Sequence, residues 1–222
     1  MALLQRLERR LPRQLTAYEV MWSDFLEAAC ARDDISIPFS SIPFLAVLLE
    51  IENPDEAGVA DALMECLEGL DIAGAVLAKS QRERAELWAL RDAIGPLVSA
   101  MAIVEPFDVS VPNKDIGRFV SATRDMLKQE LPDSTRLFFG HIADGNVHIA
   151  LGLVEERHRA IAKAIVYDAV REIGGSISAE HGIGLLKRSW LGHSRTSAEI
   201  GLMRALRKTF NPLELLNPGR IF

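Results

Sequence analysis

A turn sequence between two short apolar runs is the feature that most constrains how this chain can fold. The runs are Leu137–Gly140 and Val147–Leu153, and the tripeptide Asp144-Gly145-Asn146 lies between them. Glycine reaches positive φ without strain, and Asp and Asn side chains bond to nearby backbone, so this tripeptide favours a reversal of the chain. The sequence therefore predicts an antiparallel hairpin here.

Two histidines, His141 and His148, flank this turn. On one continuous strand their odd spacing would place them on opposite faces, so only the turn brings both imidazoles to one end of the hairpin. Glu180 follows about one helix length later. Two imidazoles and one carboxylate suit a divalent transition metal, and three protein ligands leave a position open for water or substrate. We therefore predict a catalytic metal site at His141, His148 and Glu180; the alternative is a set of polar residues beside a loop.

His181 is the neighbour of Glu180, so the two residues are not expected to share one role. If Glu180 binds the metal, His181 can face the substrate. A nearby divalent cation disfavours the protonated imidazole, and a general base must be neutral. Gly182 and Gly184 allow the backbone to approach a ligand closely. They do not form a dinucleotide fingerprint, because a third glycine at the required spacing is missing.

Composition narrows the class of protein. The chain has 222 residues, of which 49% are hydrophobic, so it can form a globular core. Its net charge is −6 without a basic block, which argues against nucleic acid and an anionic membrane surface as partners. No apolar run approaches the roughly 20 residues of a membrane span. Cys30 and Cys66 lack metal-site spacing and indicate reduced thiols, so we expect a cytoplasmic location, with an organelle matrix as the alternative.

Hydrophobic periodicity and breaker residues predict the remaining elements. Thr16 and Glu19 have the spacing of a capping box at the start of the first helix. We expect helices over 16–31, 54–69, 81–94, 113–131 and 157–173, strands over 44–51 and 72–77, an irregular or edge strand over 101–111, and a short extended segment over 176–178.

This order predicts the α+β class, with a largely antiparallel sheet and helices on one face. Two ferredoxin-like split units are the simplest decomposition. We place a boundary at Gly174-Gly175, where strand-forming sequence gives way to a helical tail. Residues 1–174 would form a substrate-binding or cap domain with a helical lead-in of about 30 residues, and residues 175–222 a C-terminal helical segment.

Three motifs in this order resemble one known family. They are HIADGNVH over His141–His148, GGSISAEHGIGLLK over Gly174–Lys187 and NPLELLNPGR over Asn211–Arg220. Together they resemble the C-terminal domain of FAD-linked oxidases of the vanillyl-alcohol-oxidase type, in the branch of D-2-hydroxyglutarate dehydrogenase, D-lactate dehydrogenase and glycolate oxidase. The resemblance runs from about Phe44 to Phe222.

The resemblance implies a reaction and a set of roles. His141, His148 and Glu180 would bind zinc or manganese, which holds a small 2-hydroxy acid, and His181 would be the catalytic base during hydride transfer to FAD. Arg91 lies in a segment whose arginine pairs with the substrate carboxylate in the family, although a surface helix arginine is an equal alternative. Asn217 matches an asparagine near the flavin, although Asn-Pro-Gly is also an ordinary turn.

Two departures from the family affect the expected function. Dicarboxylate-oxidising members carry a lysine and an asparagine where this chain has Pro106 and Ala150. We therefore expect a smaller acid, nearer lactate or glycolate than 2-hydroxyglutarate. The FAD-binding domain of the family is missing from these 222 residues, so it would be supplied in cis or in trans, and the fragment alone would be inactive. Self-association into a homo-oligomer stays open.

Two other classes of function remain at this stage. One is a non-catalytic α+β module or subunit that binds a metal or a small acid. The other is a flavin-independent metal hydrolase that uses the same residues, with His181 as base. The hydrolase is less attractive, because Glu180 is already a ligand and no other carboxylate base is near it in sequence.

Overall fold

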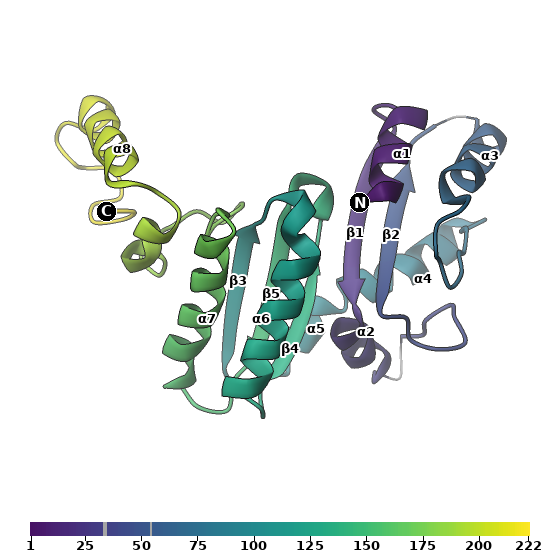
Figure 1. The fold of residues 1–222 in the computed structure, drawn as a ribbon, viewed down its shortest axis with the longest axis horizontal. Helices are drawn as coiled ribbons and strands as arrows, with labels where there is room; N and C mark the ends of the chain where they lie inside the picture. The colour runs from purple at the N-terminus through teal and green to yellow at the C-terminus, as the bar shows by residue number, and fades with distance from the viewer. Residues whose placement is uncertain (33–34, 54) are drawn as a thin grey trace.

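A five-stranded sheet forms the centre of the computed structural model, which describes residues 1–32, 35–53 and 55–222 (Figure 1). The strand order is β2-β1-β4-β5-β3, and all neighbouring strands are antiparallel. The strands are β1 (Leu15–Trp22), β2 (Leu45–Ile51), β3 (Val104–Ser110), β4 (Thr135–Gly140) and β5 (Asn146–Gly152). The predicted α+β class and antiparallel sheet are confirmed.

The hairpin predicted from the turn sequence is confirmed as β4 and β5. A short 3₁₀ helix, η2 (Ile142–Asp144), connects the strands, and Gly145 follows it with φ 79°. A Cβ atom at Gly145 would lie 2.7 Å from the carbonyl oxygen of Val111. The turn therefore needs glycine both for its backbone conformation and for its close approach to a neighbouring segment.

The second half of the chain forms one ferredoxin-like unit. It consists of β3, α6 (Ile116–Glu130), β4, β5 and α7 (His158–Glu172), and the chain then returns to bridge Ser176 to Ser110 beside β3. Among the described residues of the first half, β1 and β2 are the strands that extend this sheet. The strand predicted over 72–77 is wrong: this segment has no regular structure, and Ile72, Val76 and Leu77 stay exposed instead of packing on a core.

The helix predicted over 16–31 is also wrong, because it is β1 followed by α2 (Ser23–Cys30). Tyr18, Val20 and Trp22 are buried on one face of β1, whereas Met21 is buried on the other. Burial on both faces produces a dense apolar run whose spacing imitates a helix. The predicted capping box does not form here, since the Thr16 hydroxyl donates to the Glu50 carbonyl across the sheet.

The remaining helices are α1 (Ala2–Arg10), α3 (Glu56–Leu67), α4 (Gln81–Asp92), α5 (Ile94–Ser99) and α8 (Ser197–Phe210), with 3₁₀ turns η1 (Asn113–Asp115) and η3 (Arg188–His193). Of these, α3 and α4 follow the helices predicted over 54–69 and 81–94, α8 lies in the predicted C-terminal helical segment, and α5 was not predicted. After α4, Gly95-Pro96 does not end the helical structure but lies in the first turn of α5, where proline is tolerated. Pro54, the first residue of the helix predicted over 54–69, lies outside the described residues.

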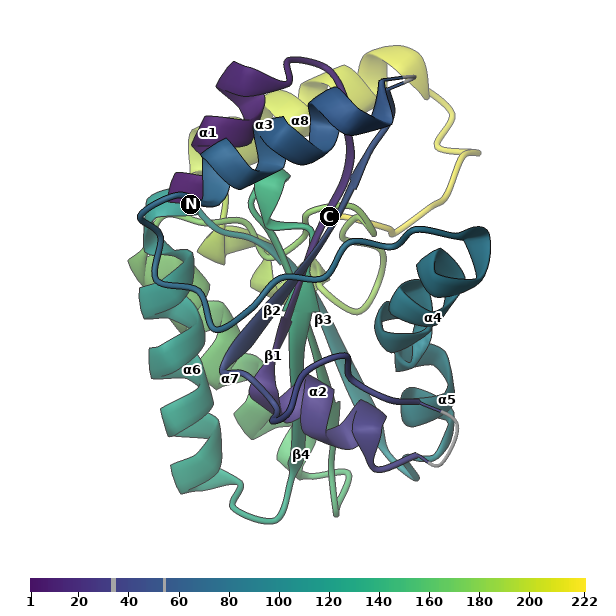
Figure 2. The same cartoon turned by 90° about the vertical axis from the view of Figure 1, so that its right-hand side faces the viewer.

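Two hydrophobic clusters lie on opposite faces of the sheet. Figure 2 shows α6 on one side of the sheet and α4 on the other. The larger cluster packs α1, α3, α6 and α7 against one face, and α2 and α4 pack on the other, so helices cover both faces and not one as predicted. A smaller cluster on the opposite face includes Phe25 of α2, Leu90 of α4 and Phe139 of β4. This second face also carries the candidate site. No helix among the described residues is long and apolar enough to cross a membrane.

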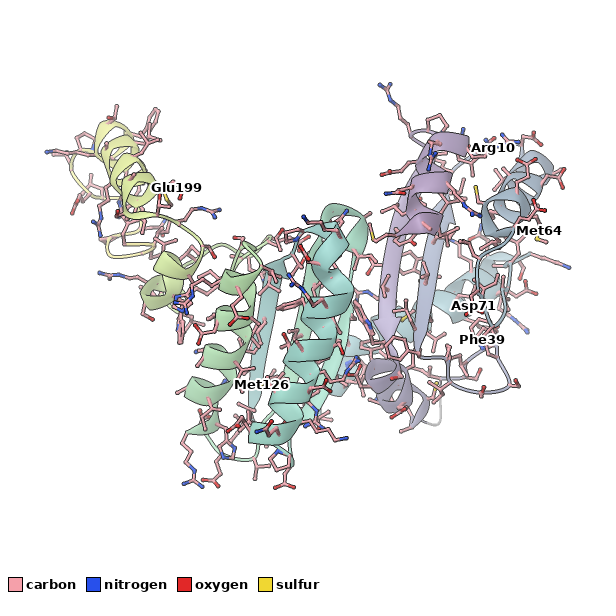
Figure 3. All side chains as sticks on the ribbon, viewed as in Figure 1. Arg10, Phe39, Met64, Asp71, Met126 and Glu199 are labelled. Carbon is pink, nitrogen blue, oxygen red and sulfur yellow. The ribbon has the colours of Figure 1, made fainter. Side chains whose placement is uncertain are left out.

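The C-terminal segment extends away from the sheet (Figure 1). Its helix α8 begins with a capping box between Thr196 and Glu199, and Glu199 is labelled in Figure 3 at the end of the molecule remote from β1 and β2. No residue of α8 is buried. The position of the domain boundary at Gly174-Gly175 stays a prediction.

Candidate metal and substrate site

The turn between β4 and β5 brings the two predicted histidine ligands together. The Nε2 atoms of His141 and His148 lie 3.2 Å apart. The Nδ1 atom of His141 lies 3.0 and 3.1 Å from the two carboxylate oxygens of Asp144. An imidazole held at Nδ1 by a carboxylate presents Nε2 as the free ligand atom, the usual arrangement around a bound metal.

Glu180 completes this cluster from the loop that follows Ser176. Its Oε1 atom lies 3.1 Å from Nε2 of His141, and ligand atoms of His141, His148 and Glu180 all lie within 4.8 Å of one another. Ligands bonded to tetrahedral zinc at about 2.0–2.1 Å would be roughly 3.3–3.4 Å apart. The donor set therefore fits a divalent transition metal, and the separations of 3.2 and 3.1 Å from Nε2 of His141 are close to this spacing. The half-exposed side chain of Glu180 is free to adjust the remaining separation, which is within 4.8 Å.

Asn146 is a further polar residue at the cluster. It is 2% exposed, its Nδ2 atom lies 3.2 Å from Nε2 of His141, and its Oδ1 atom has no partner among the described residues. Rotation of the amide exchanges these two atoms, so Asn146 can offer either a donor or an acceptor. Sequence reasoning used Asn146 only as a turn residue.

The surroundings of His148 favour its neutral form. Burial lowers the pKa of His148, and the neighbouring His141 lowers it further, against the opposing effect of Asp108. The ring also packs against Phe139, with centroids 5.2 Å apart. A histidine that stays neutral keeps the lone pair that a metal ligand requires.

Asp108 is a second residue of this site, besides Asn146, whose role sequence reasoning missed. It lies on β3 directly opposite His148 and is 1% exposed. Burial raises the pKa of Asp108, but backbone donors at His181 and Glu180 and the charge of Lys187 outweigh this effect, so its pKa lies below the ordinary value. The available signal was an acidic residue within the otherwise apolar run Phe107–Val109.

His181, the predicted base, lies at the open side of the cluster. Its side chain is 65% exposed, and its ring stacks on that of His148 with centroids 6.1 Å apart. Its Nδ1 atom lies 3.6 Å from Oδ2 of Asp108. The structure thus places an accessible imidazole beside the candidate metal ligands.

Arg91 reaches the same face of the sheet from α4. Its guanidinium carbon lies 4.8 Å from the centre of the Phe139 ring, which in turn contacts His148. The Nε atom of Arg91 donates to Glu19 at 2.6 Å, and both side chains are largely buried. Arg91 is therefore fixed beside the cluster, with a carboxylate of β1 as its present partner.

Asn217 lies outside the cluster, on the exposed turn after α8, where its φ is 46°. Its carbonyl oxygen accepts a hydrogen bond from Arg207. The end of the chain nevertheless returns toward the site, because Ile221 N–H donates to the carbonyl of Gly184 at 3.1 Å. The structure therefore brings the terminal motif next to the loop that follows His181.

Pro106 and Ala150 are cross-strand partners on β3 and β5. Each lies two residues from Asp108 or His148, so both occupy the same face of the sheet as the cluster. The two positions that depart from the dicarboxylate-oxidising pattern are thus neighbours of each other and of the site.

The fold and the cluster define an α+β domain with a candidate metal site, and sequence comparison gives its family. The family model of FAD linked oxidases, C-terminal domain, matches residues 1–221, so the match begins well before Phe44, where we expected it. The chain belongs to this family.

Curated relatives extend well beyond this chain. A D-2-hydroxyglutarate dehydrogenase of Stutzerimonas stutzeri is 33% identical over 94% of the chain and 47% of its own length. Glycolate oxidase subunit GlcD of Bacillus subtilis is 31% identical over 85% of the chain and 41% of its own length. The chain therefore spans about half the length of the curated relatives it matches.

A solved structure of alkyldihydroxyacetonephosphate synthase has a similar fold. Its TM-score is 0.51 at 14% sequence identity, and the match covers 98% of this chain and 41% of that chain. This similarity supports the fold alone.

Proposed function

We propose that this chain is the C-terminal, substrate-binding part of an FAD-dependent dehydrogenase or oxidase that acts on a small 2-hydroxy acid such as D-lactate or glycolate. The observation that carries the proposal is the convergence of His141, His148 and Glu180 on one point, within a domain of the FAD-linked oxidase family. Relatives named as hydroxy-acid dehydrogenase or oxidase support the reaction class.

Each site residue would have a distinct role. His141, His148 and Glu180 would hold zinc or manganese, which would polarise the substrate hydroxyl and stabilise the developing negative charge. His181, exposed beside them, would accept the hydroxyl proton while the Cα hydride leaves toward FAD. Arg91 would exchange its bond with Glu19 for a bond with the substrate carboxylate, a pairing that guanidinium geometry suits.

The Pro106–Ala150 pair would limit the substrate to a small acid. Neither side chain can donate a hydrogen bond to a carboxylate. A second substrate carboxylate on this side of the cluster would be desolvated without a partner there, which is unfavourable. We therefore expect D-lactate to be oxidised faster than D-2-hydroxyglutarate.

The flavin would be held mainly by a separate FAD-binding domain, in cis or in trans. The hollow beside Glu180, lined also by Ser178, Gly182 and Met203, has a volume of about 170 Å³, below the range of small-molecule pockets. The described residues therefore fit an edge contact with FAD, with Asn217 as candidate. Exposed apolar side chains on the C-terminal segment would face that domain: Leu185, Leu186, Leu202, Leu206, Phe210, Leu213, Leu215 and Leu216.

The decisive experiment joins the chain to a flavin-binding half. The N-terminal half of the Stutzerimonas stutzeri relative, loaded with FAD, would be fused to or mixed with this chain, and D-lactate oxidation followed with an artificial electron acceptor. We expect activity that requires both halves and is lost in His181→Ala. If this chain alone binds FAD tightly, the proposal that a separate domain holds the flavin is contradicted.

Absence of activity in the assembled protein, with metal and D-lactate still bound, would favour the non-catalytic binding module instead.

For the cellular location we propose the cytoplasm or an organelle matrix. The second is included because relatives of Arabidopsis thaliana and Rattus norvegicus are named as mitochondrial.

A further inference from the structure

The carboxylate of Asp108 ties the loop that carries Glu180 and His181 to the central sheet. Its Oδ2 atom accepts backbone N–H bonds from His181 at 2.8 Å and from Glu180 at 3.0 Å. The Ser178 hydroxyl lies 3.3 Å from the same oxygen and 3.0 Å from the Gly182 carbonyl, and its one proton is available to either acceptor. Burying a carboxylate is costly unless it is bonded, and the two backbone N–H groups supply that bonding.

Lys187 supplies the positive charge that faces this carboxylate. Its Nζ atom lies 3.7 Å from Oδ2 of Asp108 and donates to the Asp108 carbonyl and to the Ser178 hydroxyl, both at 3.2 Å. Lys187 lies at the C-terminal end of this loop, after Gly184, and contacts Asp108 and Ser178 from there. The segment between Ser178 and Lys187 is held to β3 at both ends by contacts with one residue.

Asp108 also faces two imidazoles. Its oxygens lie 3.9 Å from Nδ1 of His148 and 3.6 Å from Nδ1 of His181. These distances are too long for good hydrogen bonds. A negative charge beside both Nδ1 atoms nevertheless favours the tautomers that carry the proton there, which leaves both Nε2 lone pairs available.

We propose that Asp108 is the positioning residue that assembles the site from two parts of the chain. It fixes the backbone of Glu180 and His181 against β3, and it orients His148 and His181 with Nε2 available for the metal and for the substrate proton. This inference rests on the proposed function, which assigns metal binding to His148 and Glu180 and acceptance of the substrate proton to His181. In this arrangement Asp108 itself would bond to neither the metal nor the substrate.

Glu105 provides a matched control for a purely structural role. It is a second buried acid on β3, and its carboxylate pairs with Arg159 at 2.8 Å and with Lys163 at 3.4 Å. Its odd spacing from Asp108 places it on the opposite face of the sheet, under α7. Glu105→Gln therefore removes a buried charge of the same strand without touching the loop.

The test compares Asp108→Asn with Glu105→Gln in the 222-residue chain. Amide hydrogen exchange at Glu180 and His181, measured by NMR in the presence of a chelator, reports on the loop without metal. Titration with Zn²⁺ by calorimetry then reports on the assembled site. We expect Asp108→Asn to speed exchange at both amides by about tenfold or more and to weaken Zn²⁺ binding by about 10–100-fold, whereas Glu105→Gln changes neither.

Two results would overturn the inference: exchange at both amides as slow in Asp108→Asn as in the unmodified chain, or equal losses in Glu105→Gln. An unmodified chain that does not bind Zn²⁺ would instead contradict the metal site of the proposed function, while amide exchange would still decide the role of Asp108. If circular dichroism shows that Asp108→Asn does not fold, Lys187→Met is tested in its place. Lys163→Met is then the control. Faster exchange only in Lys187→Met supports the inference, and equal exchange in the two contradicts it.

Discussion

The Nε2 atoms of His141 and His148 lie 3.2 Å apart, although the residues are seven positions apart in sequence. The turn at Gly145 creates this relationship, and the carboxylates of Asp144 and Asp108 lie on the Nδ1 sides of the two rings. Two unprotonated nitrogens this close would repel each other, so a cation between them would stabilise the arrangement.

Removal of a ligand should abolish specific metal binding. We expect His141→Ala and Glu180→Ala each to weaken Zn²⁺ or Mn²⁺ binding by more than about 100-fold, a larger loss than that caused by outer-shell changes. His193→Ala is the control, because His193 pairs with Asp168 outside the cluster. Calorimetry and metal analysis after dialysis are the measurements. Unchanged metal content in either ligand variant would show that the assignment is wrong.

Gly145→Ala should destabilise the hairpin. The new Cβ would meet a carbonyl oxygen at 2.7 Å in a backbone conformation with positive φ, and we expect a cost of about 1–3 kcal/mol in the free energy of unfolding. Gly201→Ala is the matched control: Gly201 lies within α8 and a Cβ there meets no atom within 4 Å, so the change should be neutral or slightly stabilising. Urea denaturation distinguishes them, and equal stabilities would refute the assigned role of the turn.

Acid should destabilise the metal-free chain through His148. Because burial lowers the pKa of His148 below its ordinary value of 6.5, the unfolded chain binds this proton more readily than the folded chain. The corresponding stability is complete above pH 6.5 and decreases as the pH falls toward the lowered pKa. We expect His148→Gln to show a flatter dependence in urea denaturation with a chelator present. Parallel pH curves for the two chains would contradict this expectation.

Arg91 should affect substrate binding in the assembled enzyme. We expect Arg91→Met to raise KM for D-lactate by about 10–100-fold, the value of a hydrogen bond to a charged group. Arg84→Met is the control, since Arg84 lies on the same helix and pairs with Glu50. Because Arg91 also bonds to Glu19, thermal unfolding must be measured in parallel. An unchanged KM would leave Arg91 with a structural role only.

Local signals in the sequence predicted much of this protein correctly. Asp144-Gly145-Asn146 predicted the hairpin, and breaker residues located α4, α6 and α7 to within a few residues. The ordered motifs predicted the family, which the match over residues 1–221 confirms. These features depend on neighbouring residues and on backbone conformations that glycine and proline impose, so they can be read without knowledge of the fold.

Tertiary packing decided the rest. Val20 and Met21 belong to a strand rather than a helix because both faces of β1 are covered, and burial on two faces hides the strand period. Asp108 became a member of the site only when its strand paired with that of His148 and the loop carrying Glu180 folded onto it. A buried charge is stable only where distant donors meet it, and sequence alone shows neither those donors nor their distances.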